Sequence, residues 1–363
     1  MEELNKTPVK IRPEVLAVPA YKQGMAPSKQ GFKLSSNENP FATLPEVQEA
    51  VNNADVNRYA AVAMPELRAA IGGLFGLNAE TSQHMVHLAA GSVSILYQLI
   101  HAVAGPGDNY VYAWPSFEGY PLLSIATGAK GIPVALNNKF EHDLKAMAKT
   151  VTEDTRAILL CSPNNPTGPV IGAKNFHSFM KSVPKDVLVV LDEAYRELVT
   201  DSKAVRGEEV LEDYPNLVVL RTFSKAYGLA ALRIGYGVGH PAVWEAARVT
   251  GIPLSVTAQA EAAASVSLTP AVSDQLNQQI AQLVDRRVAL AEGLRSLGYE
   301  IPEAQGNFVW VPLGDDSLAF AEAFMQEGIL VRPFAGSGVR ISVGEAESVP
   351  EVLRIAGEFK KKA

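Results

Sequence analysis

Cysteine is almost absent from this 363-residue sequence, in which Cys161 is the only one. A single cysteine excludes an internal disulfide framework and is typical of proteins from a reducing compartment. The first residues, 1-MEELNKTPVKIRPE-14, lack the apolar core of a signal peptide. No stretch approaches the roughly 18 consecutive apolar residues that a membrane span needs. We therefore expect a cytoplasmic protein without a membrane partner.

Positive charge is also scarce. The chain has 32 Lys and Arg against 39 Asp and Glu, for a net charge of −7, and its only basic run is Lys360 to Lys362. This balance argues against nucleic acid as a partner. The six histidines show no spacing typical of metal ligands, so no metal site is predicted.

Short apolar runs rich in β-branched residues alternate with helical patterns from about residue 65 onward. Strands are expected at 110–114, 156–161, 187–192, 217–222 and 234–239, and helices between them include 92–104 and 173–183. Near-continuous apolar strands separated by helices indicate an α/β fold with three layers, in which helices cover both faces of a mostly parallel sheet. Ligands bind such sheets beyond the carboxyl ends of the strands.

The pattern changes near residue 252. A long helical stretch at about 256–298 leads to expected strands at 307–313 and 338–344. We therefore predict a large domain over 36–252 and a smaller α+β domain over 253–363. The Pro-punctuated residues 1–35 are expected to form an arm that packs on the small domain or on a partner subunit.

One lysine follows an expected strand in 220-LRTFSKAYGLAALRIGYGVGH-240. Lys225 can form a Schiff base if its surroundings suppress the ammonium form, although an ordinary surface lysine is the commoner case. Thr222, Ser224 and Arg233 supply two hydroxyls and a guanidinium that suit a phosphate. A lysine beside a phosphate site suggests pyridoxal 5′-phosphate.

Other strand ends can be tested against this hypothesis. The cofactor's ring nitrogen needs a buried carboxylate, and Asp192 ends the apolar run 187-VLVVLD-192. Tyr195 and Asn165 can bond its phenolic oxygen. Gly91 and Ser92 stand before an apolar helix, whose first N–H groups can bind a phosphate.

These motifs together resemble those of the fold-type I, class I/II pyridoxal-phosphate-dependent aminotransferases, in the histidinol-phosphate aminotransferase subgroup. The resemblance covers about residues 12–355, and it is closest to the aromatic (phenylalanine) aminotransferases. It is carried by 35-SSNENP-40, 57-NRY-59, 90-AGS-92, 114-WPSFEGY-120, 162-SPNNPTG-168, 191-LDEAY-195, 222-TFSKAYGLAALRIGY-236, 306-GNFVWVPL-313 and 339-VRISVG-344.

The resemblance implies a role for each matching residue. Lys225 is expected to bond the cofactor and move the substrate's Cα proton, with Asp192 and Tyr195 completing the catalytic set. The expected cofactor-binding residues are Lys225, Gly91, Ser92, Phe117, Asn165, Asp192, Tyr195, Thr222, Ser224, Arg233 and, across a dimer interface, Tyr59. Arg340 is expected to bind the substrate carboxylate, and Arg332, Asn37, Tyr21 and Asn165 are expected to line the substrate pocket.

Departures from the pattern of histidinol-phosphate enzymes bear on the substrate. Phe117 replaces a usual tyrosine, Val93-Ser94 replace an acidic or amide residue, and Ala60 follows Tyr59 where proline is usual. We expect a homodimeric aminotransferase that moves an amino group between an aromatic amino acid and 2-oxoglutarate by a ping-pong mechanism. Three alternatives stay open: histidinol-phosphate transamination, decarboxylation of threonine phosphate, and a cofactor-binding regulator without turnover.

Overall fold

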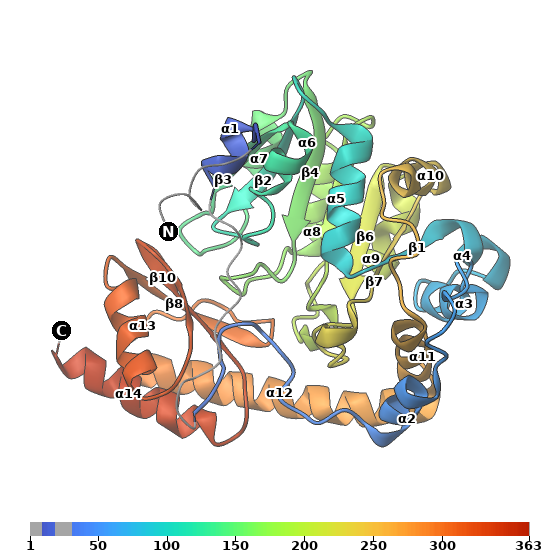
Figure 1. Ribbon diagram of the computed structural model, residues 1–363. Coiled ribbons are helices and arrows are strands. Elements are labelled where there is room, and N and C mark those ends of the chain that lie inside the picture. The colour runs from blue at the N-terminus through green and yellow to red at the C-terminus, as the bar shows by residue number, and fades with distance from the viewer. Residues whose placement is uncertain (1–8, 19–30, 363) are drawn as a thin grey trace.

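The computed structural model describes residues 9–18 and 31–362, and it contains two β-sheets (Figure 1). The larger sheet has seven strands in the order β1-β7-β6-β5-β4-β2-β3. Strands β3, β2, β4, β5 and β6 run parallel, whereas β7 is antiparallel to both β6 and β1. The predicted α/β fold with a mostly parallel sheet is confirmed. The strands are β1 (Val86–Ala89), β2 (Asn109–Trp114), β3 (Lys130–Ala135), β4 (Thr155–Cys161), β5 (Leu188–Asp192), β6 (Leu217–Thr222) and β7 (Gly235–Gly239).

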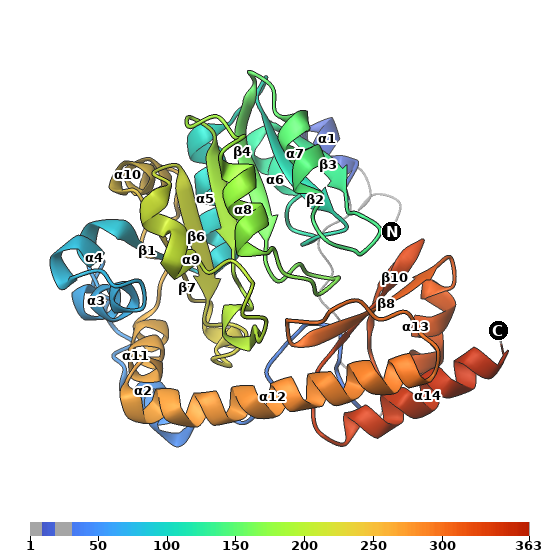
Figure 2. The same ribbon diagram turned by 180° about the vertical axis from the view of Figure 1, so that it is seen from behind.

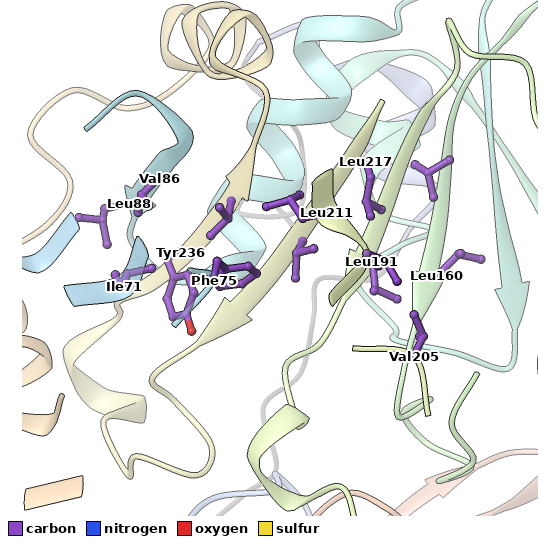
Figure 3. Packing of buried hydrophobic residues seen from close by; sticks show 14 of the residues in the cluster. Ile71, Phe75, Val86, Leu88, Leu160, Leu191, Val205, Leu211, Leu217 and Tyr236 are labelled. Atoms are coloured by element: carbon purple, nitrogen blue, oxygen red, sulfur yellow. The ribbon is translucent and has the colours of Figure 1, made fainter. Parts of the chain in front are cut away.

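The central strands are apolar on both faces because helices cover both. Successive side chains of a strand point to opposite faces, and the core divides accordingly. Ile158, Leu160 and Leu191 belong to one buried cluster, whereas Leu159 and Val190 belong to the other. Figure 3 shows side chains of the first cluster, with Leu160 and Leu191 on neighbouring strands.

The first cluster is covered mainly by α3 (Pro65–Gly73) and α8 (Ala173–Met180), and the second by α5 (Ser92–Val103) and α10 (Pro241–Val249). The views from front and back show α5 and α8 on opposite faces of the sheet (Figure 2). Further helices complete this part of the chain: α2 (Pro45–Asn53), α4 (Ala79–Met85), α6 (Leu123–Thr127), α7 (Leu144–Thr150) and α9 (Gly207–Val210).

The smaller sheet is antiparallel, with the order β8-β10-β9. Its strands are β8 (Phe308–Gly314), β9 (Arg332–Phe334) and β10 (Ser337–Ser342), and it packs with α13 (Ser317–Gln326) and α14 (Ser348–Lys362). The long helix α12 (Pro270–Ser296) runs beneath both sheets and joins them (Figure 1).

The helical stretch expected at 256–298 is two helices rather than one. The first, α11 (Ala258–Ser267), ends before Pro270, which occupies the first position of α12. Proline has no N–H to continue a preceding helix and is well suited to begin a new one. Ala260, Ala263 and Ala264 of α11 pack in the first cluster of the large sheet. We therefore propose that the division between the two domains falls within α12 rather than at residue 253.

The described parts of the predicted arm contact both regions. Arg12, just before α1 (Pro13–Leu16), donates a hydrogen bond to the carbonyl of Ile125 (3.1 Å). Leu34 packs in the core of the small sheet, and its N–H donates to the carbonyl of Leu330 (2.7 Å). Within residues 9–18 and 31–362, no helix is long and apolar enough to cross a membrane.

Candidate active site

The carboxyl ends of three neighbouring parallel strands meet at one edge of the large sheet. Cys161 ends β4 and is paired with Asp192, which ends β5, and Thr222 ends β6. Each strand delivers a polar segment to this edge: Ser162–Asn165, Asp192–Tyr195 and Thr222–Lys225. Such an edge is where open α/β sheets bind ligands.

Asp192 is buried at this edge and is 5% exposed. Tyr120 donates a hydrogen bond from its hydroxyl to Asp192 Oδ2 (2.9 Å), and the N–H of Ala194 donates to Oδ1 (3.2 Å). Burial raises the pKa of Asp192 to about 6, although the hydrogen bond from Tyr120 acts in the opposite direction. A buried carboxylate without a cationic partner is costly in the folded protein, so it is suited to pair with a positively charged ligand atom.

Phe117 packs against Tyr120, the residue that donates to this carboxylate. Its ring meets the ring of Tyr120 edge to face, with 5.4 Å between the centroids. Tyr120 has no role in the sequence prediction, although it stands in the motif 114-WPSFEGY-120 that follows strand β2. Its place after the carboxyl end of a strand was the signal that could have identified it.

Lys225 is half-buried, and its Nζ donates to the carbonyl of Ser36 (3.1 Å). The amine stands 5.9 Å from the centre of the Tyr195 ring. Burial, together with the positive charge of Arg340, lowers the pKa of Lys225 to about 7. A substantial part of this lysine is therefore a neutral amine near pH 7, as nucleophilic and proton-transfer chemistry requires.

Asn37 and Tyr195 connect the edge of the large sheet with the small sheet. Asn37 Nδ2 donates to the Tyr195 hydroxyl (3.0 Å), and the hydroxyl of Ser342 on β10 donates to Asn37 Oδ1 (2.8 Å). Asn37 has a φ of 53°, in the left-handed region that asparagine tolerates better than most residues. Burial raises the pKa of Tyr195, so its hydroxyl stays protonated and able to donate.

Arg340, also on β10, reaches the same site from the small sheet. Its Nη1 donates to Asn165 Oδ1 (2.6 Å) and its Nη2 to the carbonyl of Ser35 (2.5 Å). The side chain is buried, with 6% exposure. A buried planar guanidinium next to the amine of Lys225 is suited to bind a carboxylate with two parallel hydrogen bonds.

A cradle for an anion lies at the start of α5. Gly91 precedes this helix with a φ of 83°, and a Cβ on it would lie 2.6 Å from Arg233 Nη2. A Cβ on Gly235 would lie 2.4 Å from the backbone nitrogen of Ser92. The guanidinium of Arg233 therefore faces the positive end of a helix, a pairing that an anion between them would stabilise.

Hydroxyl groups surround the same cradle. Arg233 Nη1 donates to the hydroxyl of Ser224 (3.3 Å), and the N–H of Ser224 donates to the hydroxyl of Thr222 (3.1 Å). Thr222, Ser224 and Ser92 are buried, whereas Arg233 is exposed. These four side chains offer the donors that a phosphate group requires.

Three predicted site residues do not lie among the residues at the strand edge or the cradle described above. Arg332 is bound to Glu118 at the edge of the site. Tyr59 is 80% exposed on the surface of the chain. Tyr21 lies outside the described residues.

Comparisons with known proteins show which family the chain resembles. Residues 29–355 match the sequence profile of the family described as aminotransferase class I and II. The chain belongs to this family. It is 45% identical to the aromatic amino acid aminotransferase of Streptomyces coelicolor, with 99% of each chain covered. It is also 45% identical to the aromatic amino acid aminotransferase of Thermobifida fusca, with 98% of this chain and 99% of that one covered.

A solved structure shares the fold of this aminotransferase. The histidinol-phosphate aminotransferase from Sinorhizobium meliloti, in complex with pyridoxal 5′-phosphate, superposes with a TM-score of 0.83. The two chains are 24% identical over 97% of this chain and 99% of that one. The predicted family and its three-layer fold are thus confirmed.

The cofactor of this aminotransferase is pyridoxal 5′-phosphate, and the residues present fit it. The cradle at Gly91 has the donors for a phosphate, and the amine of Lys225 is deprotonated easily enough to bond an aldehyde. Asp192 is a buried carboxylate available to a protonated ring nitrogen. Within the part of the chain that the structure describes, no cluster of three or more His, Cys, Asp or Glu could hold a metal ion.

Proposed function

We propose that this aminotransferase moves an amino group between an aromatic amino acid (phenylalanine, tyrosine or tryptophan) and 2-oxoglutarate. The support comes from relatives that are 45% identical over nearly the whole chain and bear the name aromatic amino acid aminotransferase. The observation that carries the reaction type is the half-buried amine of Lys225, with its lowered pKa, in the neighbourhood of Arg340.

The cofactor, when bound, supplies an aldehyde and a ring that withdraws electrons from the substrate's Cα. In our proposal Asp192 holds the proton on the ring nitrogen, and Tyr195 and Asn165 bond the phenolic oxygen. Phe117 stacks on the ring. The phosphate is held by the N–H groups and side chains at the cradle, which are those of Gly91, Ser92, Thr222, Ser224 and Arg233.

Lys225 is the proposed acid and base. With a pKa of about 7, its Nζ could take a proton from the substrate's Cα and deliver it to the carbon on the other side of the amino nitrogen. Efficient proton transfer needs a pKa near the working pH, and burial provides it here. Arg340 binds the α-carboxylate of either substrate, so one site serves both half-reactions of a ping-pong mechanism.

We also propose that the enzyme is a homodimer in which Tyr59 of one subunit reaches the phosphate site of the other. Tyr59 is one of several exposed apolar side chains, the others including Val56, Val62, Val249 and Ile252. Exposed apolar patches are typical of surfaces that other proteins cover. Analytical ultracentrifugation tests the dimer, and Tyr59→Phe tests the contact by weakening cofactor binding.

A comparison of two acceptors tests the proposed function. With glutamate as donor, we expect a higher kcat/KM for phenylpyruvate than for imidazole acetol phosphate, the acceptor of histidinol-phosphate enzymes. Equal or greater activity on imidazole acetol phosphate would refute the aromatic assignment. Lys225→Ala is the control for the shared premise. After borohydride reduction and washing, the wild type should retain the cofactor's near-ultraviolet absorbance as a covalent secondary amine on Lys225, and this variant should not.

A further inference from the structure

Two arginines stand side by side on the small sheet at the mouth of the site. Arg332 on β9 is directly opposite Arg340 on β10 in an antiparallel pair. Directly opposite residues of such a pair point to the same face, and their Cβ atoms are about 5 Å apart. The inner arginine, Arg340, is buried against Asn165. The outer one, Arg332, therefore lies beside the place where a substrate carboxylate would bind Arg340.

The charge of Arg332 is neutralised by a residue of the large domain. Glu118 accepts hydrogen bonds from Arg332 Nη2 on Oε1 (2.7 Å) and from Nε on Oε2 (3.1 Å). This is the bidentate arrangement in which guanidinium and carboxylate bind most strongly. The two side chains are 20% and 28% exposed, so a substrate that enters the site removes much of the remaining water.

The position of Glu118 links this ion pair to the substrate's side chain. Glu118 follows Phe117 in the segment after β2, and it spans from the large sheet to β9 of the small one. An uncharged ring packed against Arg332 would strip water from a guanidinium, which is costly unless an opposite charge stays in place. Glu118 provides that charge. A substrate with a second anionic group has to displace Glu118 in order to bind Arg332.

We propose that Glu118 determines side-chain specificity by competing with anionic substrate groups for Arg332. This inference deepens the proposed function and rests on it, since it takes the outer end of the site as the place of an aromatic ring. Neutral side chains then bind beside an intact ion pair, and side chains that end in a carboxylate or phosphate bind at the expense of that pair.

Two unreactive ligands separate these cases on the enzyme with its cofactor bound. 3-Phenylpropionate and glutarate each carry one carboxylate for Arg340, but they end in a phenyl ring and a second carboxylate, respectively. Their dissociation constants are measured by calorimetry for the wild type, Glu118→Gln and the double variant E118Q/R332Q. Glu327→Gln is the matched control, because it breaks a carboxylate–arginine pair with Arg354 (3.2 Å) elsewhere on the small domain.

Glu118→Gln is expected to bind glutarate at least tenfold more tightly and 3-phenylpropionate no more tightly than the wild type. The tighter binding of glutarate is expected to vanish in E118Q/R332Q. Glu327→Gln is expected to leave the dissociation constants of both ligands unchanged. An equal change for both ligands in Glu118→Gln, or a gain that survives in the double variant, would overturn the proposal. If Glu118→Gln does not retain the cofactor, Glu118→Asp serves instead: its shorter carboxylate should tighten glutarate binding severalfold, and no change would refute us.

The same samples keep the two proposals apart. A wild-type enzyme without turnover of phenylpyruvate refutes the aromatic function, whereas the two binding constants still decide the role of Glu118. A wild-type enzyme that turns over phenylpyruvate, together with a Glu118→Gln variant of unchanged ligand preference, refutes only the role of Glu118.

Discussion

Replacing Asp192 with asparagine removes a carboxylate that is 5% exposed at the end of β5. Burial raises its pKa from 3.8 to about 6 in the folded protein without cofactor. Because the folded pKa lies above the unfolded one, the stabilisation from this group is fully present below pH 3.8 and is lost as the pH rises through 6. At 1.36 kcal/mol per pKa unit, the complete loss is about 3 kcal/mol.

The cofactor-free Asp192→Asn variant lacks this titration. Its free energy of unfolding, relative to the wild type, is therefore expected to increase by about 2–3 kcal/mol between pH 4 and pH 8. Urea titrations followed by circular dichroism across this range measure the difference. At the same time the variant should bind pyridoxal 5′-phosphate more weakly, since the partner of the ring nitrogen is gone.

A matched control variant and a second variant at the hydrogen-bond donor test this prediction further. Asp274→Asn on the exposed face of α12 should differ from the wild type by only a few tenths of a kcal/mol. Tyr120→Phe removes the 2.9 Å hydrogen bond to Asp192, worth about 1.5–3 kcal/mol to a charged acceptor. The pKa of Asp192 should then rise by about one to two units. A difference between Asp192→Asn and wild type that does not vary with pH would refute the reasoning.

Three further predictions concern other parts of the site and its support. Gly91→Ala places a Cβ 2.6 Å from Arg233 Nη2 at a φ of 83°, so we expect a loss of stability of about 1–3 kcal/mol and weaker cofactor binding in a fluorescence titration. Arg340→Lys replaces the planar guanidinium, which can bind a carboxylate through two N–H groups, with a single ammonium. We expect kcat/KM to fall about a hundredfold for every carboxylate substrate while the absorbance of the bound cofactor is retained. A fall for only one substrate would contradict this role of Arg340. Arg221→Met leaves the buried carboxylate of Glu193 without its 2.8 Å partner, and urea unfolding should show a loss of about 3–5 kcal/mol, against less than 1 kcal/mol if the pair is unimportant.

The sequence was most informative about the central strands and about the polar segments that follow their carboxyl ends. Continuous apolar runs such as 188–192 can be read directly because both faces of a central parallel strand are buried. Strands β1, β3 and β9 were not predicted. β1 and β9 have too few residues for a period to appear, and β3 is a mostly unburied strand at the edge of the sheet whose apolar residues are interrupted by Gly131 and Pro133. The break between α11 and α12 was also missed, although Pro270 marks it in the sequence.

The site also contains residues that could be named from the sequence and residues that could not. Lys225, Asp192, Asn165 and Arg233 could be named from the sequence because each stands in a motif at the end of a strand or in the turn that follows it. The assignments of Tyr59 and Tyr21 stay predictions, because one depends on a second subunit and the other lies outside the described residues. Tyr120 and Glu118 escaped notice, since nothing local in a tyrosine or a glutamate reveals which distant group it will bond.

The sequence by itself determined the three-layer fold, the family and the cofactor, because these depend on local patterns and short motifs. Only the tertiary structure decided which charges are paired and which are not. Glu118 meets Arg332 across 214 residues, and Asp192 is buried with a tyrosine, not a cation, as its partner. Burial and pairing of charges depend on contacts between distant segments, and they set the pKa values and the substrate preference proposed here.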